Sequence, residues 1–119
     1  MQVKGKVHIE FNDYRCHELT MHVKFKLPNQ WFTKTRSKRL ADSWWIGDVY
    51  KDWDEFWNYC YEVLNDKEYI VKEAKELIIG YIKEKYKDTE TDKHKIKINK
   101  LIKELNKNFE VEVEYEVTK

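Results

Sequence analysis

The stretch from residue 31 to residue 45, WFTKTRSKRLADSWW, holds side chains of the types that most often bind other molecules. Arg and Lys contact phosphates, and aromatic rings stack on nucleic-acid bases. Trp, Tyr and Arg also dominate the hot spots of protein interfaces. The stretch therefore predicts a binding surface, for nucleic acid or for protein. Its candidate residues, with one tyrosine further along, are Trp31, Phe32, Lys34, Arg36, Lys38, Arg39, Trp44, Trp45 and Tyr50.

A structural interpretation of the same stretch stays open. We expect a long connection here, and Trp31 and Trp45 would then anchor the two ends of the loop in the core while the charges between them are solvated. The chain has five Trp, eight Tyr and five Phe, which is more than a small core needs to hide. Some rings are therefore expected on the surface, where a cluster of them would mark a partner site.

Nucleophilic catalysis has little support in the sequence. Cys60 lies on the apolar stripe of a predicted helix, where a thiol usually behaves as a small buried hydrophobe. Cys16 precedes His17, but adjacency in sequence does not orient a base toward a thiolate. The chain has three glycines and neither a glycine-rich phosphate loop, a GxSxG motif nor an HExxH motif. We predict a protein that is not an enzyme and that uses no cofactor.

The histidines define one candidate metal site. His8 and His22 are predicted to face each other on two neighbouring strands, with Cys16 and His17 in the turn between those strands. A metal ion needs three or four ligands on one side of the structure, so the turn residues would have to fold back over the sheet. We expect ordinary solvated histidines and no metal site.

The charges of the chain are numerous but balanced. Charged residues make up 38% of the sequence, and the formal net charge is +1. This balance gives no global attraction to nucleic acid or to an anionic membrane. An acidic run directly after the basic stretch, Asp48, Asp52, Asp54 and Glu55, would repel a nucleic-acid backbone.

The sequence also bears on location. No apolar run in the chain is long enough for a signal peptide or a membrane span. Two cysteines without CxxC spacing do not suggest a disulfide scaffold, and they fit a reducing compartment. We expect a cytoplasmic protein that does not bind membranes.

Two strands are predicted near the start of the chain. Residues 2–11 and 19–27 both alternate between apolar and polar side chains, which is the pattern of half-buried strands. The short polar link between them predicts an antiparallel hairpin. A register that places Phe11 opposite Leu19 also sets lysines opposite lysines, which destabilises the pair of strands.

Three helices and a last strand are predicted further along. Asp52 and Glu55 have the spacing of a capping box and begin the first helix. An apolar stripe over residues 70–82 marks the second helix, and a third is predicted over residues 92–106. Residues 109–117, FEVEVEYEV, alternate apolar side chains with glutamates and predict a strand with an acidic outer face.

These elements predict a single α+β domain over residues 1–119, in the order ββαααβ. The acidic last strand would relieve the opposed lysines if it lay beside the first strand. We therefore predict a three-stranded antiparallel sheet of order 2-1-3, made from the N-terminal hairpin and the C-terminal strand, with one face covered by about three helices.

The predicted function is that of a small non-catalytic binding protein that acts through a protein–protein interface. A compact domain with a charge-patterned surface is also typical of small phage or mobile-element inhibitors of host or defence enzymes, and this is our more specific hypothesis. The alternative is a nucleic-acid-binding module that uses the basic and aromatic loop 31–45.

Overall fold

The computed structural model describes residues 4–12, 17–27, 30–85 and 92–118, with the backbone alone for residues 92–94, 97, 104, 108 and 110–118. The molecule is elongated, with extents of 50 × 27 × 23 Å. Its class is α+β, as predicted. The elements in chain order are β1 (Lys4–Asn12), β2 (Glu18–Lys26), β3 (Lys34–Asp42), the 3₁₀ helix η1 (Ser43–Trp45), α1 (Trp53–Leu64), α2 (Lys67–Lys85), α3 (Asp92–Asn108) and β4 (Glu110–Thr118).

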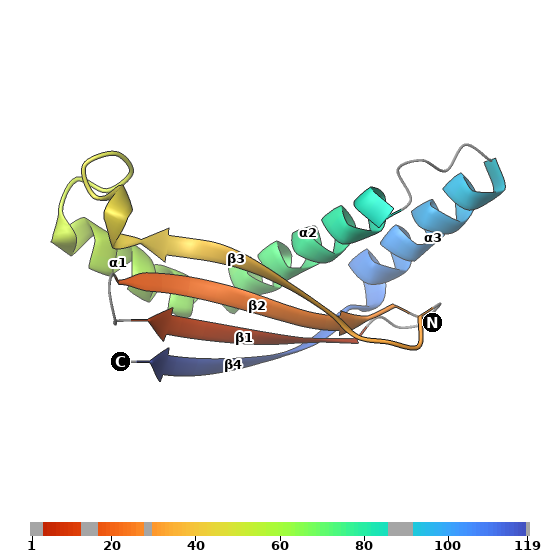
Figure 1. Cartoon of the computed structure of the whole chain (residues 1–119), viewed down its shortest axis with the longest axis horizontal. Helices are drawn as coiled ribbons and strands as arrows, with labels where there is room; N and C mark the ends of the chain where they lie inside the picture. Colours follow the sequence, from red (N-terminus) through yellow and green to blue (C-terminus); the bar gives the residue numbers. More distant parts are fainter. Residues whose placement is uncertain (1–3, 13–16, 28–29, 86–91, 119) are drawn as a thin grey trace.

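The four strands form one sheet with the order β3-β2-β1-β4 (Figure 1). β2 pairs antiparallel with both β1 and β3, so three neighbouring strands are antiparallel. β4 pairs with β1 in parallel. The prediction of a three-stranded antiparallel sheet of order 2-1-3 in the arrangement ββαααβ is therefore corrected in two respects. The sheet has one strand more than predicted, β3, and the C-terminal strand β4 runs parallel to β1 instead of antiparallel.

The missing strand, β3, lies inside the stretch predicted to be a loop. Its first six residues, 34–39, are all exposed, so they show no alternation of apolar and polar types. β3 is an edge strand, and charged side chains are common on edge strands because they discourage pairing with other chains. A sequence pattern based on burial cannot detect such a strand.

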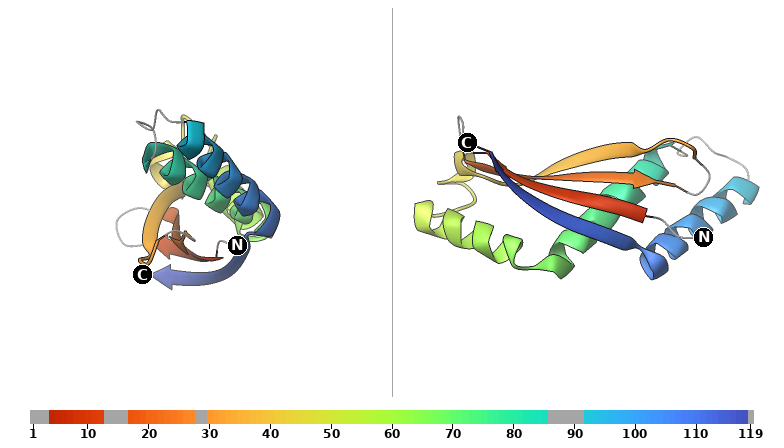
Figure 2. Two further views of the ribbon diagram at one scale, coloured as in Figure 1. Left: turned by 90° about the vertical axis from the view of Figure 1, so that its right-hand side faces the viewer. Right: turned by 90° about the horizontal axis from the view of Figure 1, so that it is seen from below.

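The parallel direction of β4 follows from the presence of β3. β3 adds one more passage of the chain along the sheet before the helices. The helices therefore begin at the opposite end of the sheet from the end that the predicted two-stranded hairpin would give. α1 and α2 then follow one another along the sheet, and α3 returns beside α2 (Figures 1 and 2). α3 ends near the start of β1, so β4 begins there and runs the same way as β1.

The predicted register of the hairpin is confirmed. Phe11 pairs with Leu19, and the lysines face each other as expected, for example Lys4 opposite Lys26. On the other side of β1, the partners of the lysine positions 4 and 6 are glutamate positions of β4. The glutamate positions of β4 therefore lie beside the opposed lysines of the hairpin, as expected, although β4 runs parallel to β1.

The helices cover one face of the sheet, and the core lies between them (Figure 2). The sheet contributes the odd-numbered apolar side chains that were predicted to share one face: Val7, Ile9, Leu19, Met21, Val23, Phe25 and Leu27. The helices contribute Phe56, Cys60, Ile70, Ala74, Ile78, Ile82 and Leu105. Burying one large aliphatic side chain stabilises the fold by about 1.5–3 kcal/mol.

The predicted start of the first helix is confirmed. The Glu55 N–H donates to Asp52 Oδ1 at 3.0 Å, so Asp52 caps α1. Glu55 Oε2 in turn accepts from the Lys51 N–H at 2.7 Å, one residue earlier than in an ideal capping box. The helices predicted second and third are also present. α1 also contributes side chains to the candidate site.

Candidate protein-binding surface

β3 divides the aromatic residues of the 31–45 stretch into two groups. Trp31 and Phe32 precede the strand, and Trp44 and Trp45 follow it. A strand of nine residues lies between the groups, and at ~3.3 Å per residue it separates them by about 30 Å. The candidate residues therefore do not form one continuous surface.

The first group lies at the end of the sheet where β3 begins. The side chain of Trp31 is 88% exposed, so it does not anchor this segment in the core. Its ring stands edge-on to that of Phe32, with 5.8 Å between ring centres. The ammonium of Lys85, the last residue of α2, lies 5.5 Å from the centre of the Phe32 ring.

The cations on the inner side of β3 have partners on α2. The Arg36 guanidinium lies 5.2 Å from the centre of the Tyr81 ring, a cation–π distance. The Lys38 ammonium donates to the carboxylate of Glu73, which is buried. Lys34 is exposed. A nucleic-acid phosphate would have to compete with these internal contacts for Arg36 and Lys38.

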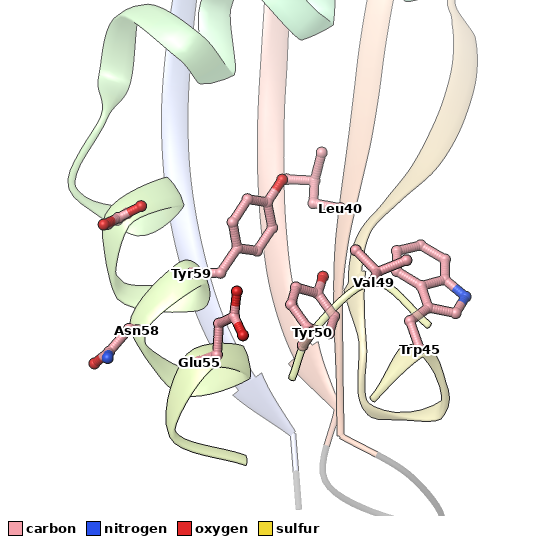
Figure 3. Close-up of a pocket in the computed structure, with 8 residues that line it drawn as sticks. Leu40, Trp45, Val49, Tyr50, Glu55, Asn58 and Tyr59 are labelled. Atoms are coloured by element: carbon pink, nitrogen blue, oxygen red, sulfur yellow. The ribbon is translucent and has the colours of Figure 1, made fainter. Parts of the chain in front are cut away.

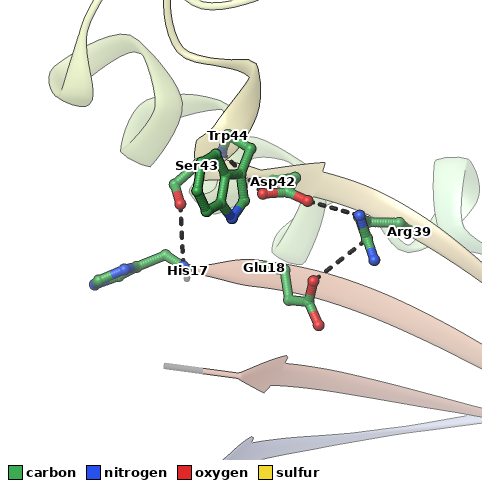
Figure 4. Close-up of polar contacts among 6 residues, drawn as sticks. All are labelled: His17, Glu18, Arg39, Asp42, Ser43 and Trp44. Atoms are coloured by element: carbon green, nitrogen blue, oxygen red, sulfur yellow. Dashed lines mark hydrogen bonds and ion pairs between the residues drawn. The ribbon is translucent and has the colours of Figure 1, made fainter. Parts of the chain in front are cut away.

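Asp42 shapes the turn that carries the second group of tryptophans. Its carboxylate is only 1% exposed, and it accepts hydrogen bonds from the Trp44 N–H at 2.9 Å and from Arg39 Nη1 at 2.8 Å (Figure 4). Asp42 therefore caps η1. Arg39 Nε also lies 3.3 Å from Glu18 Oε2 on β2, and the guanidinium compensates the buried charge of Asp42.

Two further contacts fix this turn to the rest of the fold. The His17 N–H donates to Ser43 Oγ at 3.1 Å, and the Ser43 N–H donates to the His17 carbonyl at 2.8 Å (Figure 4). The His17 ring stands edge-on to Trp53 and Trp57, with ring centres 5.4 and 5.2 Å apart. η1, the start of β2 and the start of α1 are thereby held together.

Figure 1 shows η1, the loop after it and the start of α1 together at the end of the molecule where β3 ends, and each of these segments carries an exposed apolar residue. Trp44 is 76% exposed, Val49 62% and Trp53 50%. We call these three residues the tryptophan end. They come from η1, from the loop after it and from the first residue of α1. Exposed apolar patches on small proteins often mark interaction sites.

A groove of about 640 Å³ opens beside the tryptophan end, between α1 and the segment that follows β3. Figure 3 shows Tyr59 and Glu55 on the α1 wall, Trp45 and Val49 on the opposite wall, and Tyr50 between the two walls. The lining residues are Leu40, Trp45, Val49, Tyr50, Glu55, Asn58, Tyr59 and Glu62. Among the predicted binding residues, Trp45 and Tyr50 thus meet in one place, next to Trp44.

Tyr50 lies between the two walls of the groove, and its phenol stays uncharged at neutral pH. Tyr50 is buried, and its ring centre lies 5.5 Å from that of Tyr59. Burial raises the pKa of Tyr50 to about 12. A hydrogen bond with Tyr59, together with burial, also raises the pKa of Tyr69 on α2. The charge of the groove therefore comes from its glutamates.

The sequence analysis did not single out several residues of this end. Trp53, Tyr59 and Glu62 lie outside the set of predicted binding residues. Trp53 is the first residue of α1, one turn before Phe56, the first core residue of the helix, and its side chain is half exposed. The sequence feature that indicates these residues is the density of aromatic and acidic side chains directly after the basic stretch.

A separate polar cluster lies on the face of the sheet opposite the helices. His22 Nδ1 lies 2.6 Å from Ser37 Oγ, and His22 Nε2 lies 3.1 Å from Glu10 Oε2. The order of these groups resembles a serine–histidine–acid relay. They connect three neighbouring strands on an open sheet face, where a bound substrate would stay in contact with water.

The structure gives no support to the candidate metal site. The rings of His8 and His22 do lie near each other, with centres 6.1 Å apart. Cys16 falls outside the described residues. Among the residues that are described, no group of three or more His, Cys, Asp or Glu side chains is placed to hold a metal ion.

The buried thiol of Cys60 is poorly suited to nucleophilic chemistry. Cys60 is packed in the core, and burial raises its pKa to about 11. The thiolate is the reactive form of cysteine, and very little of it exists at neutral pH when the pKa is this high. Cys60 therefore behaves as the small core hydrophobe that was predicted.

Comparisons of the chain with protein-family models, with curated proteins and with solved structures found no match. In the part of the chain that the structure describes, no helix is sufficiently long and apolar to cross a membrane. Inference about function therefore rests on the surface chemistry of the α+β fold itself.

Proposed function

We propose that this chain is a small non-catalytic protein-binding module that acts through the tryptophan end. The exposure of Trp44 on a fixed turn carries the proposal. Its backbone N–H is bonded to the buried Asp42, and the preceding residue, Ser43, is bonded to His17. A large ring presented on a rigid backbone loses little conformational entropy when it binds.

The surroundings of Trp44 also support an interface. Val49 and Trp53 are further exposed apolar residues in the segments that follow η1, and the groove, which Val49 lines, provides a concave area. Interface hot spots combine a buried aromatic anchor with a pocket, and the contacts around them exclude water. In the free protein Trp44 is solvated, so its burial by a partner would add a large apolar contribution to binding.

Replacement of Trp44 tests this proposal. The Trp44→Ala variant is expected to bind its partner about 30-fold more weakly or worse, which corresponds to ~2 kcal/mol or more at a hot spot. The tagged protein captures partners from a nuclease-treated lysate of the source cells, and the affinity of each variant for the purified partner is then measured.

The matched control is Trp31→Ala, because Trp31 is also largely exposed but lies at the opposite end of β3. It is expected to bind the partner as the unchanged protein does. The proposal fails if Trp31→Ala weakens capture and Trp44→Ala does not, or if nuclease treatment removes all captured protein.

Inhibition of a host or defence enzyme, as carried out by small phage and mobile-element proteins, is our more specific proposal. It is supported only by general character, namely a small chain with a charge-patterned surface and an exposed aromatic end. If the captured partner is an enzyme, addition of one equivalent of this protein should abolish its activity, and Trp44→Ala should restore it. Full activity of the saturated complex would exclude inhibition.

Nucleic-acid binding by residues 31–45 remains the alternative. The exposure of residues 34–39 along one edge of the sheet favours it. The separation of the rings by β3, together with the internal partners of the cations, weakens it. Binding of this kind would fall steeply as salt rises, and Lys34→Glu together with Arg36→Glu would abolish it for any nucleotide sequence.

A further inference from the structure

We infer that the groove beside the tryptophan end takes a cationic side chain, Arg or Lys, from a basic segment of the protein partner. This inference rests on the proposed function and names the chemistry of the partner. The charge of this end of the molecule, the lining of the groove and the availability of its carboxylates all favour a cationic ligand.

The charge of the chain is unevenly distributed. Residues 43–66, which form η1, the following loop and α1, hold six acidic residues and one basic residue. This segment therefore has a net charge of −5, whereas the whole chain has a net charge of +1. An acidic surface attracts basic partners and accelerates their encounter. The exposed apolar residues of the tryptophan end lie within this acidic segment.

The lining of the groove fits a long side chain with a charged tip. The rings of Trp45, Tyr50 and Tyr59 provide apolar and π surfaces, while Glu55 and Glu62 provide carboxylates. The two glutamates are seven residues apart on α1, so they project from the same face of the helix two turns apart. The aliphatic stem of Arg or Lys packs on rings while its charged head reaches carboxylates.

The carboxylates of the groove are available to a ligand. Among the described residues, Glu55 accepts one hydrogen bond, from the Lys51 N–H to Oε2. Glu62 forms no hydrogen bond or ion pair with any residue that the structure describes. The described residues that line the groove include neither Lys nor Arg. The negative charge of the groove is therefore not neutralised from within by its own lining.

The size of the groove sets the form of the ligand. Its volume of about 640 Å³ exceeds that of one side chain and falls within the ~300–1,000 Å³ of ordinary ligand pockets. It therefore accommodates a cationic side chain together with its adjoining backbone. The same negative charge disfavours phosphates and acidic peptides, which would be repelled by Glu55 and Glu62.

Two peptides test the inference on the full chain. The cationic probe is a capped five-residue peptide with two arginines flanking a leucine, and the anionic probe has glutamates in place of the arginines. Nuclear magnetic resonance of the nitrogen-15-labelled protein follows the Trp45 indole N–H and the backbone amides of residues 45–62. The arginine peptide is expected to shift these signals, and the glutamate peptide is expected to leave them in place.

Charge removal in the groove provides the specific variant. Glu55→Gln combined with Glu62→Gln is expected to weaken binding of the arginine peptide at least ten-fold. The control combines Glu68→Gln with Glu84→Gln, which removes two exposed carboxylates from α2 and changes the net charge equally. This control should bind the peptide as the unchanged protein does. Equal thermal unfolding of all three proteins verifies that the fold is intact.

Three results would overturn the inference: no shift with the arginine peptide, equal weakening in both double variants, or self-association that fills the groove with a second copy. The outcome is separable from that of the proposed function. If Trp44→Ala abolishes capture of the partner while the groove variant affects neither peptide nor partner, only the inference fails. If Trp44→Ala also has no effect on capture, the proposed function fails with it.

Discussion

Asp42 connects the fold to the candidate site at the scale of a single residue. It ends β3, caps η1 and is paired with Arg39, all with a carboxylate that is almost completely buried. A buried carboxylate is tolerated because both of its oxygens have donors. The position of Trp44 therefore depends on the buried carboxylate of Asp42, which is itself not exposed at the surface.

Asp42→Ala is expected to lower the free energy of unfolding by about 2–4 kcal/mol, because it removes a cap and leaves Arg39 without its closest carboxylate. Asp42→Asn retains an acceptor for the Trp44 N–H, so its cost should be smaller. Urea denaturation of the three proteins measures the difference. Equal midpoints for Asp42→Ala and the unchanged protein would contradict this role.

The raised pKa of Tyr50 predicts a loss of stability in alkali. Between pH 10 and about pH 12, the unfolded state releases the phenol proton while the folded state retains it, so the free energy of unfolding falls as pH rises. The contribution that is lost is up to about 3 kcal/mol. Below pH 9 the stabilisation is fully present, because the phenol is protonated in both states.

Tyr50→Phe should therefore show a flatter decline of stability between pH 10 and pH 12 than the unchanged protein. The control is Tyr61→Phe, which removes a phenol hydroxyl from an exposed position on α1. Denaturant titrations at a series of pH values give the slopes. A steeper slope for Tyr50→Phe than for Tyr61→Phe would refute the assignment.

β3 is the element whose prediction failed, and the reason lies in how it is stabilised. The strands β1 and β2 place an apolar side chain inward at every second residue, so their pattern is visible in the sequence. β3 has such residues only at its end, Leu40 and Ala41. Its first part is held by pairing with β2 and by contacts of Arg36 and Lys38 with α2. Contacts between distant segments leave no local pattern.

Lys38→Ala tests the attachment of β3 to α2. It leaves the buried Glu73 without its cation, and because Lys38 itself is partly exposed to water, the expected cost is about 1–2 kcal/mol. Adding Glu73→Gln to Lys38→Ala should recover part of this loss, since the unpaired charge is removed. Unfolding free energies of the single and double variants form the cycle, and additive effects would show that the pair is not coupled.

At the scale of the whole molecule, charge is separated along the chain. The acidic segment 43–66 contrasts with α3, whose last turn is basic. The near-zero net charge of the chain hides this separation, because it sums regions of opposite sign. An interface at the tryptophan end would be governed by its local charge and not by the total charge of the chain.

The association rate with the captured partner is accordingly expected to fall several-fold between about 0.05 and 0.5 M salt, because screening shortens the reach of the acidic segment. The dissociation rate should change little in comparison, since the apolar contacts of Trp44 and Trp53 are not screened. Stopped-flow or surface-binding kinetics separate the two rates. An association rate that does not respond to salt would show that the acidic segment does not steer the partner.

The sequence by itself determined the α+β class, the hairpin register, the three helices and the start of α1, because these depend on local periodicity and on neighbours close in the chain. It also indicated that rings would remain exposed, and Trp31, Trp44 and Trp53 are. Only the tertiary structure decided that β3 is an edge strand, that β4 runs parallel to β1 and that Trp45, Tyr50 and Tyr59 line one groove. These features arise where segments distant in sequence meet, and the free energy of such contacts depends on the whole path of the chain.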